Sequence, residues 1–545
     1  MIANKVVHRD RLDILSPALR VKLFFYKYKI VAAFGLLFSA ILYSFMMTHQ
    51  LTNTFDGLWH QNYYHAAGTE LSSGRWLLFF VDKAMMGLHA DPIASLCALT
   101  LFIIGFLFVL ELLDVRNSFI SCLALALFLS STLVSNTLSY RYASVGYAVA
   151  YFLAILALYA AVRIENTFLA VCLSGLFLGL SMSCYQAYSS VFCTVAVCYI
   201  ISRCARDNDQ DLDKTGSLRQ IILRICASLA IGALFYITSL CLALLLSRSS
   251  LSDYNGVDAL TLRQFIVQLP RNFIRTYKAF FAYFFLDKLK INRLQPFGVF
   301  WLLFALFVAA IVVMAVRVWK IEKLRLLPLL SAAAFLPVSA SVYMLLIGDK
   351  LELQMTAGLA MLVPLVLIIA FASMGDKKII KTLMVILSLA LLYGGAMQVW
   401  FDQEAMYEGQ NASETIMEQV LSDLEDENLL SSEYQYFFIG VPYENPLFSV
   451  SDVYYCSNAY AQIGNFWVSG NCLQMSYEGL LIKRMGIKLD FLYASYDTVS
   501  DEFDVSSLPI FPNNGYITMV NENTILVKIS EYKPYQGDSK YVFNN

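Results

Sequence analysis

Long apolar runs recur through the first 400 residues of the chain. Each is close to the roughly 20 residues that an α-helix needs to cross the hydrocarbon core of a bilayer. The runs cover residues 29–48, 93–113, 118–136, 145–162, 167–184, 186–202, 221–247, 298–316, 326–347, 356–373 and 379–400. This pattern predicts a polytopic α-helical membrane protein with about eleven transmembrane helices. Two further segments, 76–88 and 259–286, are apolar on one face only, which is typical of helices that lie in the membrane interface.

The pattern changes after residue 400. Residues 404–430 have the apolar spacing of a helix, "YQYFFIGVP" (434–442) reads as a buried strand, and residues 515–529 alternate around a turn as a hairpin does. We therefore predict a basic N-terminal segment (1–28), a transmembrane domain (29–400) and a small α/β domain (401–545).

Composition agrees with this division. The chain is 58% hydrophobic and 15% charged, whereas soluble domains are about 45–50% apolar and about 25% charged. Residues 401–545 contain 21 acidic and 6 basic side chains, a net charge of −15, and the rest of the chain has a net charge of +13. The two parts are therefore expected to lie in different surroundings.

Lysine and arginine positions predict the orientation in the membrane. The N-terminal segment and the loops at 203–219, 317–325 and 375–381 are all basic. With eleven spans these four segments fall on one side, which the positive-inside rule assigns to the cytoplasm. We predict a multi-pass plasma-membrane protein whose N-terminus is cytoplasmic and whose C-terminal domain is extracytoplasmic. No cleavable signal peptide is visible, so the first run would serve as an uncleaved anchor.

Motifs of soluble enzymes are absent from the sequence. There is no GxGxxG after a strand, no P-loop, no GxSxG, no HExxH and no cysteine pattern for zinc. The predicted spans have almost no charge at mid-membrane, which argues against an ion-coupled pump. Cys456 and Cys472 alone fall in the C-terminal domain, where they could form a disulfide or remain free thiols.

The loop after the first run, "TNTFDGLWHQNYYHAAGTELSSGRWLLFF" (52–80), holds the best candidates for chemistry. Asp56 could act as a general base in a partly desolvated site, or cap the helix-like run that follows it. Glu70 is a second candidate acid, or a solvated loop carboxylate. Arg75 could bind a lipid phosphate, or extend its side chain toward headgroups.

Other polar and aromatic side chains fall on the same predicted side. Basic residues there run against the usual charge bias and favour an anionic ligand, and aromatic residues stack on sugars as well as forming interface belts. Each basic residue taken singly is more often an interfacial anchor than a ligand. The candidates are Arg271, Lys288 and Arg293 for an anion, and Trp59, Trp76, Tyr140, Arg141, Tyr185 and Gln186 for a substrate.

The motif "FDGLWHQNYYHAAGTELSSGRWLL" after the first span, "YQAY" at a later outer turn and the polytopic pattern resemble the GtrII-type glucosyltransferases, membrane enzymes of the GT-C fold class. The resemblance covers roughly residues 30–400 and leaves the C-terminal domain unexplained. It implies transfer of a sugar, typically glucose, from a polyprenyl-phosphate donor to a cell-surface polysaccharide outside the membrane. Asp56 matches the expected base, and Glu70 matches a second acidic position.

Under this hypothesis, Arg75 and the basic group at 271–293 hold the donor phosphate, and no metal or other cofactor is required. Displacement with one base predicts inversion at the anomeric carbon. Three alternatives remain open at this point: a flippase or exporter of lipid-linked saccharide, a polysaccharide polymerase or ligase with a diphosphate-linked donor, and a surface receptor led by the C-terminal domain.

Overall fold

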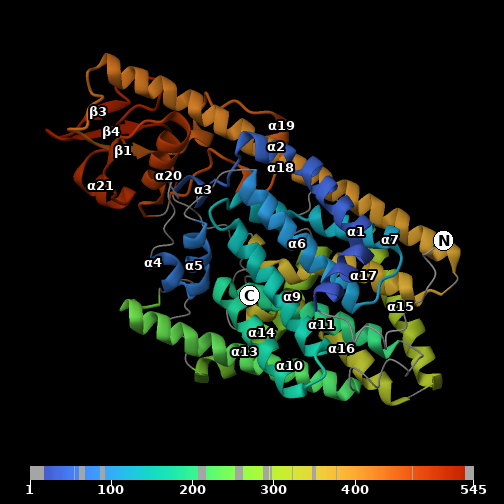
Figure 1. Ribbon diagram of the computed structural model, residues 1–545. Helices are drawn as coiled ribbons and strands as arrows, with labels where there is room; N and C mark the ends of the chain where they lie inside the picture. Colours follow the sequence, from blue (N-terminus) through green and yellow to red (C-terminus); the bar gives the residue numbers. More distant parts are fainter. Residues whose placement is uncertain are drawn as a thin grey trace.

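The computed structural model describes residues 17–54, 56–59, 68–85, 92–205, 217–251, 262–285, 294, 298–321, 323–345, 352–375, 377–468 and 470–533. A bundle of apolar helices forms most of the molecule, and a small domain containing a β-sheet lies at one end of it (Figure 1). The α/β tail that the sequence predicts is therefore present.

Each apolar run of the sequence forms helix. The bundle helices are α1 (Pro17–Leu42), α2 (Ser44–His49), α6 (Ile93–Leu112), α7 (Ser118–Leu129), α8 (Thr132–Ser139), α9 (Ser144–Arg163), α10 (Thr167–Cys184), α11 (Ser189–Cys204), α13 (Leu218–Ser247), α15 (Val299–Ile321), α16 (Leu326–Ala340), α17 (Ala357–Ser373) and α18 (Lys378–Asp426). The short 3₁₀ helices η2 (Gln186–Tyr188), η6 (Val342–Leu345) and η7 (Leu353–Met355) connect some of them.

The number of clear spans is smaller than the sequence predicts. Within the described ranges, nine helices are long and apolar enough to cross a membrane, or ten if α7 and α8 count as one broken span. The predicted count of eleven also included α17, which has only 17 residues. The predicted third span is bent by 50° between α7 and α8, and the end of α8 contacts Thr52 and Asn53 through the Ser139 carbonyl.

Short helices follow the first span, between the bundle and the C-terminal domain (Figure 1). They are α3 (Asp56–Trp59), α4 (Gly68–Ser72) and α5 (Trp76–Ala84). A longer amphipathic helix, α14 (Leu262–Phe284), contains Pro270 and exposes several large apolar side chains. Helices α5 and α14 correspond to the two segments predicted to lie in the interface.

The first span breaks between α1 and α2, and one side chain satisfies the backbone there. The Gln403 amide accepts a hydrogen bond from the Met46 backbone N–H (2.8 Å) and donates one to the Leu42 carbonyl (2.9 Å). In addition, the Tyr43 hydroxyl donates to the Leu129 carbonyl of α7 (2.6 Å). Backbone groups freed by a break in a membrane helix need such partners, so α18 and α7 make the break possible.

Helix α18 has 49 residues and continues without a break through residue 400. The helix predicted at 404–430 is therefore the continuation of the last predicted span. The long helix carries the C-terminal domain at its far end (Figure 1).

The sheet of the C-terminal domain has four strands in the order β2-β1-β4-β3. Strands β1 (Gln435–Ile439), β2 (Asp490–Phe491) and β4 (Thr524–Lys528) are parallel neighbours, and β3 (Ile517–Met519) pairs with β4 antiparallel. Helices α19 (Asp452–Cys456), α20 (Cys472–Leu480) and α21 (Tyr496–Glu502) accompany the sheet. The predicted strand and hairpin are confirmed.

Cys456 and Cys472 are both free thiols. Of the two possibilities that the sequence left open for this pair, the structure has the unpaired one.

A buried carboxylate joins the C-terminal domain to α18. Asp402 is 0% exposed. It accepts hydrogen bonds from the Gln398 amide (2.9 Å), from the Asn458 backbone and side-chain N–H groups (both 2.9 Å) and from the Tyr460 hydroxyl (2.7 Å). A further hydrogen bond joins the Tyr460 hydroxyl to that of Ser135 in α8 (2.9 Å). A buried charge is tolerated only with such partners, so these contacts fix residues 458–460 against the bundle.

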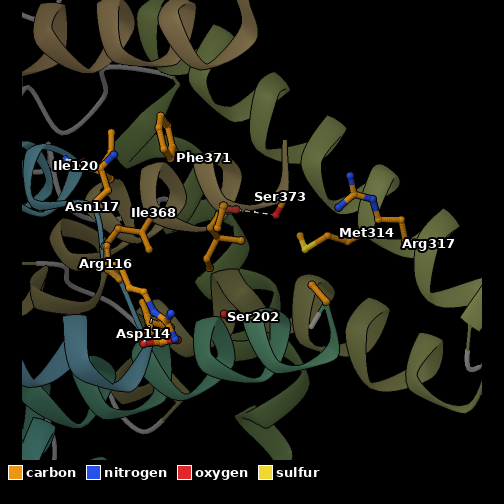
Figure 2. Close-up of a pocket in the computed structure, with 15 residues that line it drawn as sticks. Asp114, Arg116, Asn117, Ile120, Ser202, Met314, Arg317, Ile368, Phe371 and Ser373 are labelled. Atoms are coloured by element: carbon orange, nitrogen blue, oxygen red, sulfur yellow. Dashed lines mark hydrogen bonds and ion pairs between the residues drawn. The ribbon is translucent and has the colours of Figure 1, made fainter. Parts of the chain in front are cut away.

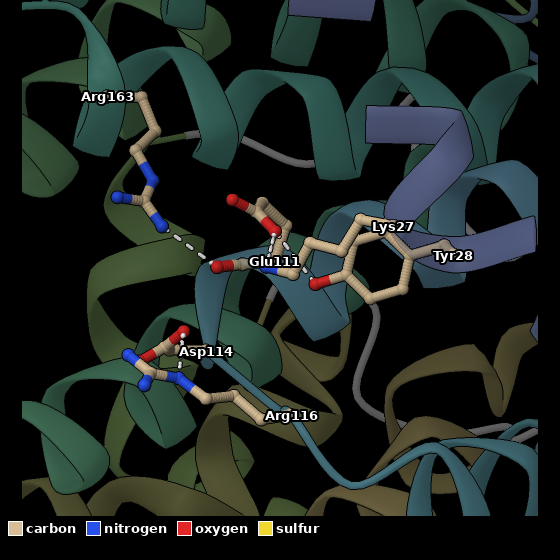
Figure 3. Close-up of polar contacts among 6 residues, drawn as sticks. All are labelled: Lys27, Tyr28, Glu111, Asp114, Arg116 and Arg163. Atoms are coloured by element: carbon tan, nitrogen blue, oxygen red, sulfur yellow. Dashed lines mark hydrogen bonds and ion pairs between the residues drawn. The ribbon is translucent and has the colours of Figure 1, made fainter. Parts of the chain in front are cut away.

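The opposite end of the bundle is basic. Figure 3 shows Lys27 and Tyr28 of α1 on the carboxylate of Glu111, at Nζ–Oε2 2.5 Å and OH–Oε2 2.8 Å. Arg163 at the end of α9 donates to the Glu111 carbonyl (2.8 Å), and Arg116 pairs with Asp114 (3.2 Å). The ends of α1, α6 and α9 therefore meet on this face, which we call the basic end.

We expect Asp402→Ala to lower the free energy of unfolding by about 2–4 kcal/mol, because three buried donors on Asn458 and Tyr460 lose their acceptor. The thermal unfolding midpoint of the purified protein in detergent measures this effect. Glu418→Ala, an exposed acid on the same helix, is the matched control. Equal midpoints for the two variants would contradict the assignment.

Candidate active site

Residues 51–54 follow α2 and lead to the candidate site. The Thr52 hydroxyl and the Asn53 backbone N–H both donate to the Ser139 carbonyl at the end of α8 (3.1 Å each). The Thr54 backbone N–H donates to the Tyr460 carbonyl (3.2 Å), and its hydroxyl donates to the Asn465 carbonyl (3.3 Å). The segment before Asp56 is therefore held by the bundle on one side and by the C-terminal domain on the other.

Asp56 is the first residue of α3 and does not cap it. The Asn53 side chain takes that role, because its Oδ1 accepts a hydrogen bond from the Gly57 backbone N–H (2.5 Å). A Cβ on residue 57 would lie 1.7 Å from Thr52 Oγ1 and 2.7 Å from Asn53 Oδ1. The tight turn therefore admits only glycine after Asp56, which excludes a second acid at that position.

The Asp56 carboxyl group lies among charged and hydroxyl groups from distant parts of the chain. Burial raises its pKa to about 6. The Arg75 guanidinium and a hydrogen bond with Tyr140 lower the pKa, and the Glu352 charge raises it. A carboxyl group with a pKa near neutrality is suited to take up a proton during a reaction.

Arg75 stands at the turn between α4 and α5. Its guanidinium lies over the ring of Tyr185, 4.4 Å from the ring centroid, in a cation–π arrangement. Its charge also acts on Asp56. The side chain thus points into the site instead of extending along the membrane surface, which was the alternative that the sequence left open.

Gly74 makes this turn possible. It has φ +79°, and a Cβ there would lie 2.6 Å from the Tyr236 hydroxyl and 2.9 Å from Gln186 Nε2. Gln186 donates to the Ser73 carbonyl (3.0 Å), and Tyr236 of α13 donates to the Gly74 carbonyl (3.2 Å). These bonds hold the turn close to α13 and η2 and so position Arg75.

Glu70 of α4 and Asp82 of α5 form a buried carboxyl pair. They are 5% and 2% exposed, and their carboxyl groups are close enough for a shared proton to join them. Burial, followed by the charge of Glu70, raises the pKa of Asp82 far above its ordinary value. Two carboxylates this close in a buried site cannot both be ionised, so the pair holds a proton at neutral pH.

Tyrosine rings fill the space between these charged groups. The Tyr147 ring lies 6.1 Å from that of Tyr140 and 5.0 Å from that of Tyr185, measured between centroids. Tyr147 is also within electrostatic range of Asp56, Glu70, Arg75 and Asp82. The site is therefore a compact group of acids around one arginine, with an aromatic lining.

The C-terminal domain supplies a lysine to the site. Lys483 lies in η10 (Leu481–Met485), a single π-helical turn after α20, and its Nζ donates to the Gly57 carbonyl (2.6 Å). Burial, with the Arg141 charge as a smaller contribution, lowers the pKa of Lys483 to about 7. Arg141 itself donates to the Gln50 carbonyl (3.0 Å). Two basic side chains from different domains thus flank the turn that carries Asp56.

The remaining residues predicted for the site fall in several places. Trp76 donates from Nε1 to Ser239 of α13 (3.1 Å), which anchors α5. Trp59 ends α3, and Arg271 is an exposed residue of α14. Lys288 and Arg293 lie outside the described residues.

Sequence reasoning did not select Asp82, Tyr147, Glu352 or Lys483. Asp82 has the clearest signal, because it is a carboxylate within the apolar run "WLLFFVDKAMM" (76–86). Nothing in the local sequence distinguishes the other three. In the part of the chain that the structure describes, no three His, Cys, Asp or Glu side chains are grouped to hold a metal ion.

Comparison with known proteins identifies the family. The model of the family described as "Glucosyl transferase GtrII" matches residues 60–369, which is more than half of the 545-residue chain. The chain belongs to the GtrII glucosyltransferase family. The same comparisons match the chain to no curated protein and to no solved structure.

Membership in the GtrII family makes the chain a multi-pass membrane glycosyltransferase, which needs a sugar donor and an acceptor. The resemblance inferred from the "SGRW" loop is therefore confirmed. The matched region contains Glu70, Arg75, Tyr140 and Tyr185. Asp56 and Lys483 lie outside the matched region, although both belong to the candidate site.

We expect Gly57→Ala to reduce glycosyl transfer about 100-fold, because the new methyl group displaces the Asp56 turn from Thr52 and Asn53. Initial rates of transfer by the purified variant measure the effect, with size-exclusion profiles to verify folding. Ser44→Ala, an exposed change in α2, is the control. A rate for Gly57→Ala equal to that of the control would contradict this account of the turn.

Proposed function

We propose that this GtrII protein transfers a hexosyl unit, glucose in the simplest case, from a polyprenyl-phosphate-linked donor to a cell-surface polysaccharide on the extracytoplasmic side. One observation carries the proposal: Asp56, with a pKa of about 6, hydrogen-bonds Tyr140 and lies in the field of Arg75. A base and a cation in a partly desolvated site are the groups that such a transfer requires.

In the proposed reaction, a hydroxyl group of the acceptor gives its proton to the Asp56 carboxylate. The acceptor oxygen attacks the anomeric carbon as the bond from that carbon to the phosphate oxygen breaks. The lipid phosphate leaves with the electron pair of the broken bond. Because attack occurs opposite the leaving group, the anomeric configuration is inverted.

Arg75 would hold the leaving phosphate. Its guanidinium is preorganised by Tyr185 and by the turn that Gly74 and Gln186 hold. A fixed donor at the point where negative charge develops lowers the barrier without reorganisation. Arg271, with Lys288 and Arg293, remains a proposal for the same phosphate.

The remaining acids and rings would serve the sugar. Glu70, paired with Asp82 and so sharing a proton, could donate or accept a hydrogen bond at a sugar hydroxyl. The rings of Tyr140 and Tyr185 offer apolar faces to a pyranose.

Topology supports an extracytoplasmic site. The basic residues of α1, α9, α15 and α18 gather at the end opposite Asp56, and the positive-inside rule assigns that end to the cytoplasm. The C-terminal domain then lies outside, beside the acceptor. Its net charge of −15 over residues 401–545 repels polyanions, which favours a neutral polysaccharide.

Asp56→Asn tests the proposed base. We expect a rate decrease of about 100- to 10,000-fold, because the amide cannot accept the proton. Purified protein in detergent is given polyprenyl-phosphate glucose and candidate glycans, and the released lipid phosphate is measured. Asp497→Asn, an exposed change in α21, is the control.

Wild-type turnover by Asp56→Asn would contradict the assignment. Transfer from a diphosphate-linked donor alone would indicate the polymerase or ligase alternative. Movement of the intact lipid-linked sugar across a vesicle membrane without transfer would indicate a flippase.

The pH dependence of the rate tests the environment of Asp56. The carboxylate is the active form, so the rate should fall as the pH is lowered through about 6, by about tenfold for each further pH unit. Tyr140→Phe removes a hydrogen bond that favours the Asp56 carboxylate, so the pKa of Asp56 rises. The acidic limb of the pH–rate profile therefore moves to higher pH. Tyr393→Phe, on an exposed face of α18, should leave the profile unchanged. If the acidic limb of Tyr140→Phe coincides with that of the wild type, the hydrogen bond between Tyr140 and Asp56 is refuted.

A further inference from the structure

A pocket of about 280 Å³ lies at the basic end, and Figure 2 shows residues that line it. Ligand pockets typically measure about 300–1,000 Å³. This pocket is slightly smaller than that range, so it suits a compact polar group better than a whole drug-sized ligand. Residues from the loop after α6, from the ends of α11 and α17 and from α15 form its wall. Neither the family match nor the proposed transfer gives this pocket a role.

The wall of the pocket is polar on its rim and apolar behind it. Figure 2 shows Arg317 and Met314 entering from one side and Asp114 and Arg116 from the other. The apolar part includes Ile120, Ile368, Ile369 and Phe371, and Ser202 and Ser373 add hydroxyl groups. Such a wall suits an amphiphilic ligand that has a polar headgroup joined to an apolar chain.

The rim has an excess of positive charge. Arg116 is neutralised by Asp114, with Nη2 3.2 Å from Oδ2. Arg317 makes no hydrogen bond or ion pair with any residue that the structure describes. Two arginines and one aspartate leave the rim with one net positive charge, so the ligand that it favours is an anion.

Helix α15 joins this pocket to the lipid phase. Val308, Val312 and Val316 recur at intervals of four residues and are 45%, 55% and 51% exposed, so they form one outward apolar face. Trp319 follows at the same end and is 54% exposed, at the position that interfacial tryptophans prefer. Met314 and Arg317 lie three residues apart and line the pocket. Arg317 directly follows Val316 and is itself exposed, so the lipid-exposed surface of α15 extends to the rim of the pocket.

We propose that this pocket binds the phosphate headgroup of an anionic phospholipid from the leaflet at the basic end. The phosphate would contact Arg317, the glycerol region would meet Ser202 and Ser373, and one acyl chain would lie along the exposed face of α15. Basic pockets between transmembrane helices on the cytoplasmic side bind anionic headgroups in this way. The bound lipid would fill the space between α15 and α17 at this end.

The test measures lipid retained by the purified full-length protein. Protein is reconstituted in nanodiscs of equal parts phosphatidylglycerol and phosphatidylcholine, then released into detergent, and the retained lipids are counted by native mass spectrometry. We expect phosphatidylglycerol to be retained over phosphatidylcholine. Arg317→Gln should lower its retention about fivefold, and Lys320→Gln, three residues further along α15 and outside the pocket, should not.

Ser202→Met provides a second variant, because it fills the pocket while both arginines remain. We expect it to lower phosphatidylglycerol retention as Arg317→Gln does. Size-exclusion profiles and unfolding midpoints verify that each variant folds. Because Arg317 is exposed, Arg317→Gln should disturb folding less than Ser202→Met does.

Three outcomes would overturn the proposal. One is wild-type retention of phosphatidylglycerol by Arg317→Gln, and another is equal retention of the two lipids by the wild type. The third concerns lipid-free protein: millimolar inorganic phosphate raises its unfolding midpoint, and Arg317→Gln abolishes this increase. That result would assign the pocket to a soluble anion. None of these readouts depends on glycosyl transfer.

Discussion

The site depends on the buried hydrogen bonds that Asp402 accepts. Its carboxylate holds Asn458 and Tyr460, and the Tyr460 carbonyl holds Thr54, two residues before Asp56. A carboxylate with 0% exposure would be costly alone, so its partners must stay in place while the protein is folded. The position of the Asp56 turn is thus set by a group that takes no part in the proposed chemistry.

This arrangement explains why one chain combines an apolar bundle with an acidic domain. The bundle supplies Arg75, Tyr140 and the acid pair, but the Asp56 turn has bundle contacts on one side only. The C-terminal domain supplies the other side through Tyr460 and through Lys483, which donates to the Gly57 carbonyl. Because α18 runs unbroken from the membrane into this domain, both halves of the site share one rigid support.

Charge separates the two ends of the molecule. At the candidate site, acids outnumber basic side chains, and Glu70 and Asp82 share a proton. The Arg75 guanidinium, which lies over the Tyr185 ring, therefore has a strong local effect. At the basic end, cations are in excess and one arginine faces a pocket beside the lipid-exposed side of α15. The first environment suits the departure of a phosphate, and the second suits the retention of one.

The sequence by itself determined the helices and the strand and hairpin of the tail, because apolar period and turn residues are local properties. The motif of the first loop also carried the resemblance to the GtrII family, which the family model matches. It also selected Asp56, Glu70 and Arg75 as candidates from one loop. Only the tertiary structure placed Asp82 against Glu70, and Glu352 and Lys483 near Asp56. Lys483 and Gly57 are 426 positions apart, and no local pattern encodes such a contact. The continuity of α18 through residue 400 was likewise decided by packing, since the polar residues Asp402 and Gln403 have their partners in distant segments.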